Sequence, residues 1–162
     1  MLVSGVVLGT LLGVLIGRSW EPLFETEIKL FPVLIGSLLL RVIAPFAPGM
    51  AYLLYVVGLG LTVIAAGANF RLAGAIRVAA GGALNLGVVL ANAGMPVDPA
   101  ALATAGARMP SDALHVPLTT SSALGAFADV IPVALVHNVY SAGDFVIAVG
   151  GFLVPFMLLS RK

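Results

Sequence analysis

Long apolar blocks, each with almost no charged side chain inside it, constrain this chain more than any other feature of its sequence. Only 9% of the 162 residues are charged and 60% are hydrophobic, whereas a soluble domain carries roughly 25% charged residues. So few charges would leave much of the surface of a globule without a polar covering. The sequence therefore predicts an all-α integral membrane protein, with a single membrane domain over residues 1–162.

The apolar blocks predict about five transmembrane helices, which makes the chain a polytopic helical membrane protein. The predicted spans are residues 2–17, 28–46, 49–68, 75–93 and 144–159. The first and the last are short, because about 20 residues are needed to cross a bilayer core of roughly 30 Å. No basic residue precedes the first block, so we expect a retained helix there rather than a cleaved signal peptide.

The basic residues alternate between the two sides of the predicted membrane. They follow the first span, follow the third span and end the chain: Arg18, Lys29, Arg71, Arg77, Arg161 and Lys162. Basic loops favour the cytoplasmic side of a membrane. We therefore expect a multi-pass protein of the cell (cytoplasmic) membrane, with the N-terminus and residues 94–143 outside and the C-terminus in the cytoplasm.

The segment 94–143 is the most polar part of the chain and is predicted to be a partly structured outer loop. Within it, Asp98, Pro99 and Gly106 are typical of the N-cap, the first residue and the end of a short helix. The apolar run 130–136, VIPVALV, is interrupted by a proline. This run fits either an edge strand or a segment that dips into the membrane interface.

Glycine recurs at every fourth position of the first span, at Gly5, Gly9, Gly13 and Gly17. This spacing places the four residues on one face of a helix, where another helix can approach closely. The neighbouring helix could belong to this chain or to a partner protein. We favour a contact within the chain, because glycine is common in transmembrane helices generally.

Two aspartates stand beside apolar residues, Asp129 in GAFADVIPV and Asp144 in YSAGDFVIAVGG. A carboxylate beside hydrocarbon is costly unless it is paired, caps a helix or has a function. Two carboxyl groups brought together in a poorly solvated site cannot both ionise, so one keeps a proton near neutral pH. The ionised group could activate water while the protonated group polarises a peptide carbonyl. This is aspartic-peptidase chemistry, and it needs no metal and no cofactor.

Structural roles for the same residues remain open. Asp144 could cap the last helix, and Asp129 could be a solvated loop carboxylate. Asn85 and Asn92 share one face of a predicted helix, so they could orient carboxylates or form hydrogen bonds between helices. Arg41 lies inside the second span and could extend to the lipid headgroups or form an ion pair with an aspartate.

Other chemistries find little support in the sequence. The chain has no cysteine, which removes disulfides, thiol nucleophiles and cysteine-ligated metal sites. His115 and His137 are far apart and form no local metal-ligand motif. No cluster of basic residues indicates a nucleic-acid partner, and no inverted repeat indicates a transporter. We therefore expect no metal, no cofactor and no nucleic acid.

The two aspartate segments resemble the last part of bacterial lipoprotein signal peptidase. FADVIPV is similar to that family's Val-Val-Asp-Phe-Ile context, and YSAGDFVIAVGGFLV is similar to its Phe-Asn-x-Ala-Asp motif, which opens the last helix. GGALNLGVVL is similar to its Gly-Gly-Ala-Leu-Gly-Asn stretch. The resemblance covers residues 75–159 and implies that Asp129 and Asp144 are catalytic, with Asn85 and Ser141 as supporting residues.

The pattern LANAGMPV, FADVIPV and YSAGDFVI is still more similar to a bacterial family of small polytopic membrane proteins with no assigned function. Together the resemblances imply a membrane protein related to lipoprotein signal peptidase. As an enzyme it would be an aspartic-type intramembrane endopeptidase acting on a lipid-modified or transmembrane peptide in the lipid bilayer, with Arg41 as a further supporting residue. The alternative is a non-catalytic accessory or lipid-binding membrane protein, whose glycine face contacts a partner helix.

Overall fold

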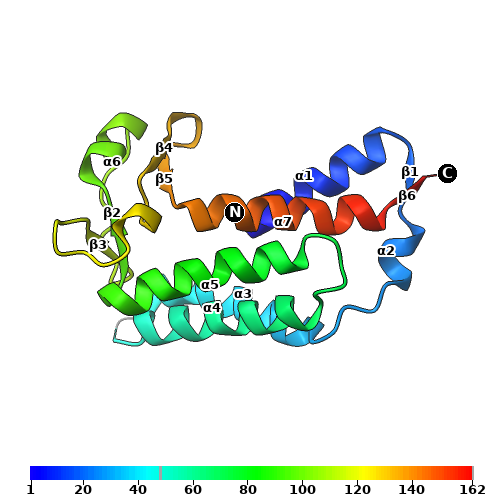
Figure 1. The fold of residues 1–162 in the computed structure, drawn as a ribbon, viewed down its shortest axis with the longest axis horizontal. Coiled ribbons are helices and arrows are strands. Elements are labelled where there is room, and N and C mark those ends of the chain that lie inside the picture. Colours follow the sequence, from blue (N-terminus) through cyan, green and yellow to red (C-terminus); the bar gives the residue numbers. More distant parts are fainter. Residues whose placement is uncertain (48, 162) are drawn as a thin grey trace.

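The computed structural model describes residues 1–47 and 49–161, and within them the chain is mostly helical (Figure 1). The longer helices of this part are α1 (Leu2–Leu15), α3 (Phe31–Ile43), α4 (Ala51–Ala68), α5 (Ala75–Asn92) and α7 (Ala142–Leu158). The shorter ones are α2 (Glu21–Glu25), α6 (Pro99–Ala105) and the 3-10 turns η1 (Ala44–Phe46), η2 (Gly125–Phe127) and η3 (Ala134–Val136).

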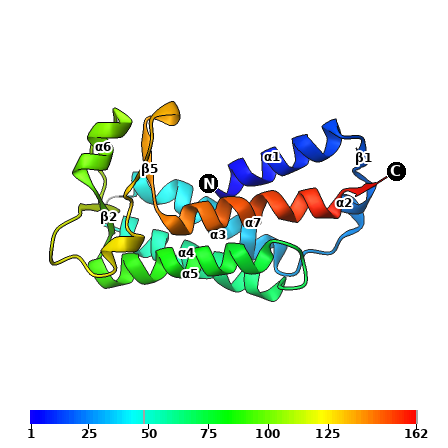
Figure 2. The ribbon, with the colours of Figure 1, turned by 45° about the horizontal axis from the view of Figure 1, so that its top comes forward.

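The five longer helices lie side by side, and neighbours pack in the order α1, α7, α5, α4, α3. This order differs from the chain order because α7 packs between α1 and α5. An apolar groove of about 330 Å³ lies among α1, α3, α4 and α7, and its wall includes Val6, Leu34, Ala65 and Val154. The connecting segment, residues 93–141, covers one end of the helices (Figure 2).

Three pairs of short strands complete the described fold. Near the C-terminus, β1 (Arg18–Ser19) pairs antiparallel with β6 (Ser160–Arg161). In the connecting segment, β2 (Met95–Val97) pairs parallel with β3 (His115–Pro117), and β4 (Ile131–Val133) pairs antiparallel with β5 (Asn138–Tyr140). The segment that we expected to be a partly structured loop therefore contains strands and a helix over much of its length.

The short helix predicted in this segment is confirmed as α6. The Asp98 side chain accepts a hydrogen bond from the Ala100 amide at 2.9 Å, which makes Asp98 the N-cap. Pro99 is the first helical residue. Gly106 ends the helix with a φ of +67°, a left-handed conformation that glycine adopts without steric cost.

The structure shortens several of the predicted membrane spans. Two helices, α4 and α5, are long and apolar enough to cross a membrane, at 18 residues each. The helix predicted over 28–46 begins only at Phe31, because Leu30 has a left-handed backbone with φ 57°. The helix predicted over 2–17 ends at Leu15, and Gly17 turns the chain with φ +79°.

The end of the chain departs from the prediction as well. Helix α7 spans Ala142–Leu158, so it begins two residues before the predicted span 144–159. The cytoplasmic side expected for Lys162 concerns a residue outside the described part of the chain.

The glycine face of α1 packs against α7. A Cβ atom at Gly5 would overlap the backbone of Ala148, and one at Gly9 would overlap the backbone of Phe152. Gly13 faces the side chain of Leu159. The close contact favoured by the sequence therefore lies within the chain for these three glycines, whereas open space surrounds Gly17. A partner helix on this face stays a prediction.

We predict that Gly9→Ala lowers the melting temperature of the protein in detergent, whereas Gly60→Ala leaves it equal or raises it. Both substitutions gain about 1 kcal/mol of helix propensity. At Gly9 the new methyl group meets the Phe152 backbone, and overpacking of this kind costs about 1–3 kcal/mol. At Gly60 it meets open space. Equal melting temperatures for the two variants would show that α1 does not pack on α7 as described.

Candidate functional site

Helix α7 begins with a reciprocal pair of hydrogen bonds between Ser141 and Asp144. The Ser141 hydroxyl accepts a hydrogen bond from the Asp144 amide at 3.1 Å, and Asp144 Oδ2 accepts one from the Ser141 amide at 3.3 Å. This arrangement is a capping box, which satisfies amide groups that the first turn of a helix leaves free. The suggestion that Asp144 caps the helix is therefore corrected: Ser141 is the N-cap, and Asp144 is the third residue of α7.

Asn85 of α5 connects the two helices at this point. Its Nδ2 donates a hydrogen bond to Asp144 Oδ1 at 3.1 Å, and its Oδ1 lies 3.0 Å from the Ser141 hydroxyl. Both Asn85 and Ser141 are almost completely buried. Of the two roles considered for Asn85, the structure places it against a carboxylate on another helix, so it orients Asp144 and also joins α5 to α7.

Two glycines allow this connection. A Cβ atom at Gly143 would overlap the Asn85 amide, and one at Gly81 would overlap the carbonyl oxygen of Gly143 at 2.5 Å. Side chains at these positions would push α5 and α7 apart and break the hydrogen bonds between Asn85 and Asp144. The two glycines thus allow both the close packing of α5 on α7 and the hydrogen bonds between these helices.

Asp129 is held by the backbone beside β2. Its amide donates to the Pro96 carbonyl and its carbonyl accepts from the Asp98 amide, each at 2.9 Å, which adds a parallel bridge between Asp129 and Val97. The residue is only 7% exposed, and its Oδ1 is buried without a hydrogen-bond partner in the described chain. The alternative of a solvated loop carboxylate is therefore wrong.

Burial and a neighbouring charge keep Asp129 protonated. Desolvation is the larger cause and the charge of Asp144 the smaller one, and together they raise the pKa of Asp129 to about 8. At pH 7 the side chain is therefore mostly a neutral acid, able to donate a hydrogen bond.

Asp129 and Asp144 line the same cavity, which has a volume of about 140 Å³. Tyr55 of α4 and Tyr140 of β5 contribute to its wall. A cavity of this size holds a few water molecules, and its polar walls offer them partners. The structure therefore brings together the two aspartates singled out in the sequence, although their catalytic role stays a prediction.

His115 lines the same cavity, and the sequence analysis gave it no role there. Its Nδ1 lies 2.8 Å from Asp112 Oδ1. Burial would raise the pKa of Asp112, but hydrogen bonds from the His115 ring and the Leu114 amide outweigh it and lower that pKa. The Asp-x-x-His spacing in a loop is the local signal that could have indicated this pair.

Arg41 is not among the residues that line the cavity. Its stem lies against Gly58 of α4, and its guanidinium group lies 5.7 Å from the centre of the Tyr55 ring. An ion pair with Asp129 or Asp144, one of the two alternatives, is absent from the described residues. Arg41 therefore contacts the site through Tyr55.

A sequence model of a family of unknown function, DUF5317, matches residues 23–156. The chain belongs to this family. Its matched range includes the whole site, from Arg41 to Asp144, whereas α1 lies before it. No curated protein and no solved structure matches the chain. These comparisons confirm the predicted membership in a family without assigned function, and they provide no link to lipoprotein signal peptidase.

The raised pKa of Asp129 predicts a specific dependence of stability on pH. Its ordinary value is 3.8 and its folded value about 8, so between these values the folded state binds more protons than the unfolded state. The stabilisation is complete below the lower pKa and is lost as the pH rises through the higher one. From about pH 6 to about pH 9, we expect the melting temperature to fall more in the wild type than in Asp129→Asn.

Asp98→Asn is the matched control for this comparison, because asparagine caps a helix about as well as aspartate. We expect its melting temperatures to follow those of the wild type. If Asp129→Asn also follows the wild type across the whole range, Asp129 is not held as a neutral acid.

Proposed function

We propose that this protein is a membrane-embedded aspartic peptidase, with Asp129 as the acid and Asp144 as the base. One observation carries the proposal: a buried carboxyl group with a pKa of about 8 shares a small polar cavity with a second carboxyl group that is held in place by hydrogen bonds. Two carboxyl groups whose surroundings differ in this way are suited to opposite roles in proton transfer.

The proposed reaction is hydrolysis of a peptide bond by a water molecule in the cavity. Asp144 takes a proton from this water as its oxygen attacks the carbonyl carbon, while Asp129 donates its proton to the carbonyl oxygen. The tetrahedral intermediate then collapses. The C–N bond breaks, the leaving nitrogen takes the proton held by Asp144, and Asp129 regains a proton from a hydroxyl group of the intermediate. Both carboxyl groups return to their starting states.

Asn85 and Ser141 act in this scheme as positioning residues. Both of the Asp144 carboxyl oxygens accept hydrogen bonds, Oδ1 from Asn85 and Oδ2 from Ser141. These bonds fix the rotamer of the base relative to the cavity, and a fixed geometry of this kind lowers the entropic cost of the reaction.

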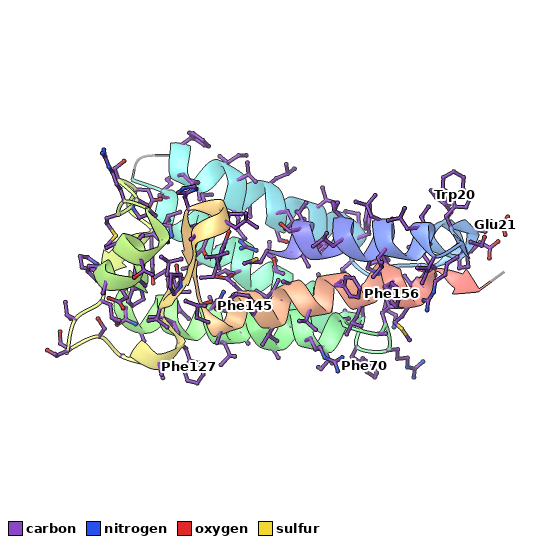
Figure 3. All side chains as sticks on the ribbon, turned by 90° about the horizontal axis from the view of Figure 1, so that it is seen from above. Trp20, Glu21, Phe70, Phe127, Phe145 and Phe156 are labelled. Atoms are coloured by element: carbon purple, nitrogen blue, oxygen red, sulfur yellow. The ribbon has the colours of Figure 1, made fainter. Side chains whose placement is uncertain are left out.

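The same proposal includes a membrane topology of five crossings, in which α1, α3 and α7 span the bilayer beside α4 and α5. Aromatic residues, which favour membrane interfaces, support it: Trp20 packs edge-to-face on Phe24 at one end of the helices, and Tyr140 packs on Phe145 at the other. Figure 3 shows Trp20 and Phe127 toward opposite ends. Helix α7, with 17 residues, is about 25 Å long, and bilayers adapt to mismatches of this size.

The positions of the basic residues support an orientation for this proposed topology. Arg18 and Arg161 lie on paired strands at the end that holds Trp20, and Lys29 is joined by its backbone to Asn69 near Arg71. Basic residues favour the cytoplasm, so the aspartate cavity faces outward.

Single cysteines test this topology, because the chain has none of its own. In intact cells, a membrane-impermeant thiol reagent should label Ser111→Cys, which lies in the connecting segment, but not Ala73→Cys, which lies in the turn between α4 and α5. Both positions are exposed. Labelling of Ala73→Cys before Ser111→Cys would reverse the proposed orientation.

Two isosteric variants test the catalytic roles. Asp129→Asn and Asp144→Asn should each lower the rate of cleavage by roughly 100-fold or more, because an amide cannot transfer the proton. Two probes are used: a transmembrane peptide cut at its outer end, and the same peptide carrying a lipid on the residue after the cut. Asp98→Asn serves as the active control. Failure of the wild type to cleave either probe would contradict the peptidase proposal.

A second candidate function, lipid binding without catalysis, is favoured by the apolar groove of about 330 Å³. The capping box gives Asp144 a structural role that needs no chemistry. Under this alternative, Asp144→Asn would be nearly silent in every assay, since asparagine preserves most hydrogen bonds of the helix end.

A further inference from the structure

The hairpin formed by β4, η3 and β5 exposes apolar side chains at its tip. Leu135 is 91% exposed and Val136 is 54% exposed. From Val130 to Tyr140 the sequence contains no Asp, Glu, Lys or Arg. Strands at the surface of a soluble protein usually carry charges that keep them in water and prevent association. A hairpin that lacks Asp, Glu, Lys and Arg and has an apolar tip favours an apolar surface that covers it.

The hairpin lies at the level where α7 enters the proposed membrane. Strand β5 ends at Tyr140 and α7 begins at Ala142, so the base of the hairpin is within about 7 Å of the first turn of the helix. The ring of Tyr140 lies 6.3 Å from that of Phe145, an aromatic pair typical of a membrane interface. Figures 1 and 2 show the hairpin projecting sideways beside the start of α7, not continuing along its axis.

We propose that the tip, Leu135 and Val136, inserts into the outer leaflet of the lipid bilayer. This inference rests on the membrane topology proposed above. Transfer of the two aliphatic side chains from water into lipid stabilises such a contact. A second copy of the chain is a poorer occupant, because β4 has only three residues and Pro132 removes one of its amide donors.

The hairpin also forms part of the aspartate cavity. Asn138, Val139 and Tyr140, all in β5, line the cavity together with Asp129 and Asp144. A tip held in the lipid therefore fixes one wall of the cavity at the membrane surface. The partner of the hairpin tip is therefore the bilayer itself. A substrate that reaches the cavity arrives along the interface between the membrane and water.

Tryptophan fluorescence in lipid vesicles tests the insertion directly. The chain has one tryptophan, so Trp20→Phe provides a silent background into which Leu135→Trp or Val136→Trp is introduced. Both side chains are exposed, so neither substitution disturbs the core. We expect blue-shifted emission and strong quenching by lipids brominated near the headgroup end of the acyl chain. Aqueous iodide should quench it weakly.

Two further positions separate the possible failures. Ser111→Trp, in the connecting segment beside Asp112, should respond only to iodide. Leu53→Trp, on an exposed face in the first turn of α4, should be quenched by lipids brominated near the outer headgroups if the proposed topology is correct. Lipid bromines could quench Leu53→Trp while Leu135→Trp and Val136→Trp respond only to iodide, as Ser111→Trp does. This result would overturn the insertion and retain the topology.

If brominated lipids fail to quench Leu53→Trp as well, the proposed topology is overturned together with the insertion. Blue-shifted emission at Leu135→Trp without bromine quenching, accompanied by cross-linked dimers, would assign the tip to a second copy and also overturn the proposal.

Discussion

The contact between α5 and α7 supports the rest of the site. It joins a glycine-lined helix packing, at Gly81 and Gly143, to a buried polar network of Asn85, Ser141 and Asp144. Each part requires the other. Without the glycines the Asn85 amide could not reach the carboxyl group, and without the amide the half-buried Asp144 would lose the hydrogen bond to its Oδ1. A polar network inside an apolar protein fixes one relative position of two helices more sharply than apolar packing alone.

The connecting segment adds the second carboxyl group to this helix pair. Asp129 is carried by a bridge to Val97 of β2, and β2 follows directly after α5. The strand therefore connects the position of Asp129 to the same helix that holds Asn85. Asp129 and Asp144 are thus placed by one connected set of elements, although their surroundings differ. Asp129 lacks a partner for one oxygen, whereas both oxygens of Asp144 accept hydrogen bonds.

Local patterns in the sequence predicted local features well. The α6 caps at Asp98 and Gly106 follow from residues within nine positions of each other, and the structure confirms them. The same kind of reasoning could have identified Ser141 as the cap of α7, because Ser-x-x-Asp is a variant of the capping-box pattern. Hydropathy overextended the spans at Gly17 and Leu30, since the backbone there is left-handed and hydropathy does not report backbone conformation.

The remainder of the site depends on pairings between distant segments. Nothing near His115 in the sequence indicates that β3 pairs parallel with β2, yet this register brings His115 beside Met95 and into the cavity. The burial of Asp129 likewise arises from its bridge to Val97, more than 30 residues away. The sequence could mark both aspartates as anomalous, because each stands among apolar residues. It could not show which of them would be buried without a partner.

The central claim is that Asp129 is a neutral acid beside Asp144, and infrared spectroscopy of the protein in lipid measures this directly. A protonated buried carboxyl group has a C=O stretching band separate from those of carboxylates and amides. The account predicts one such band at neutral pH that disappears with an apparent pKa of about 8 and is missing in Asp129→Asn. A wild-type spectrum without a protonated carboxyl band at neutral pH, or a band that persists in Asp129→Asn, would contradict it.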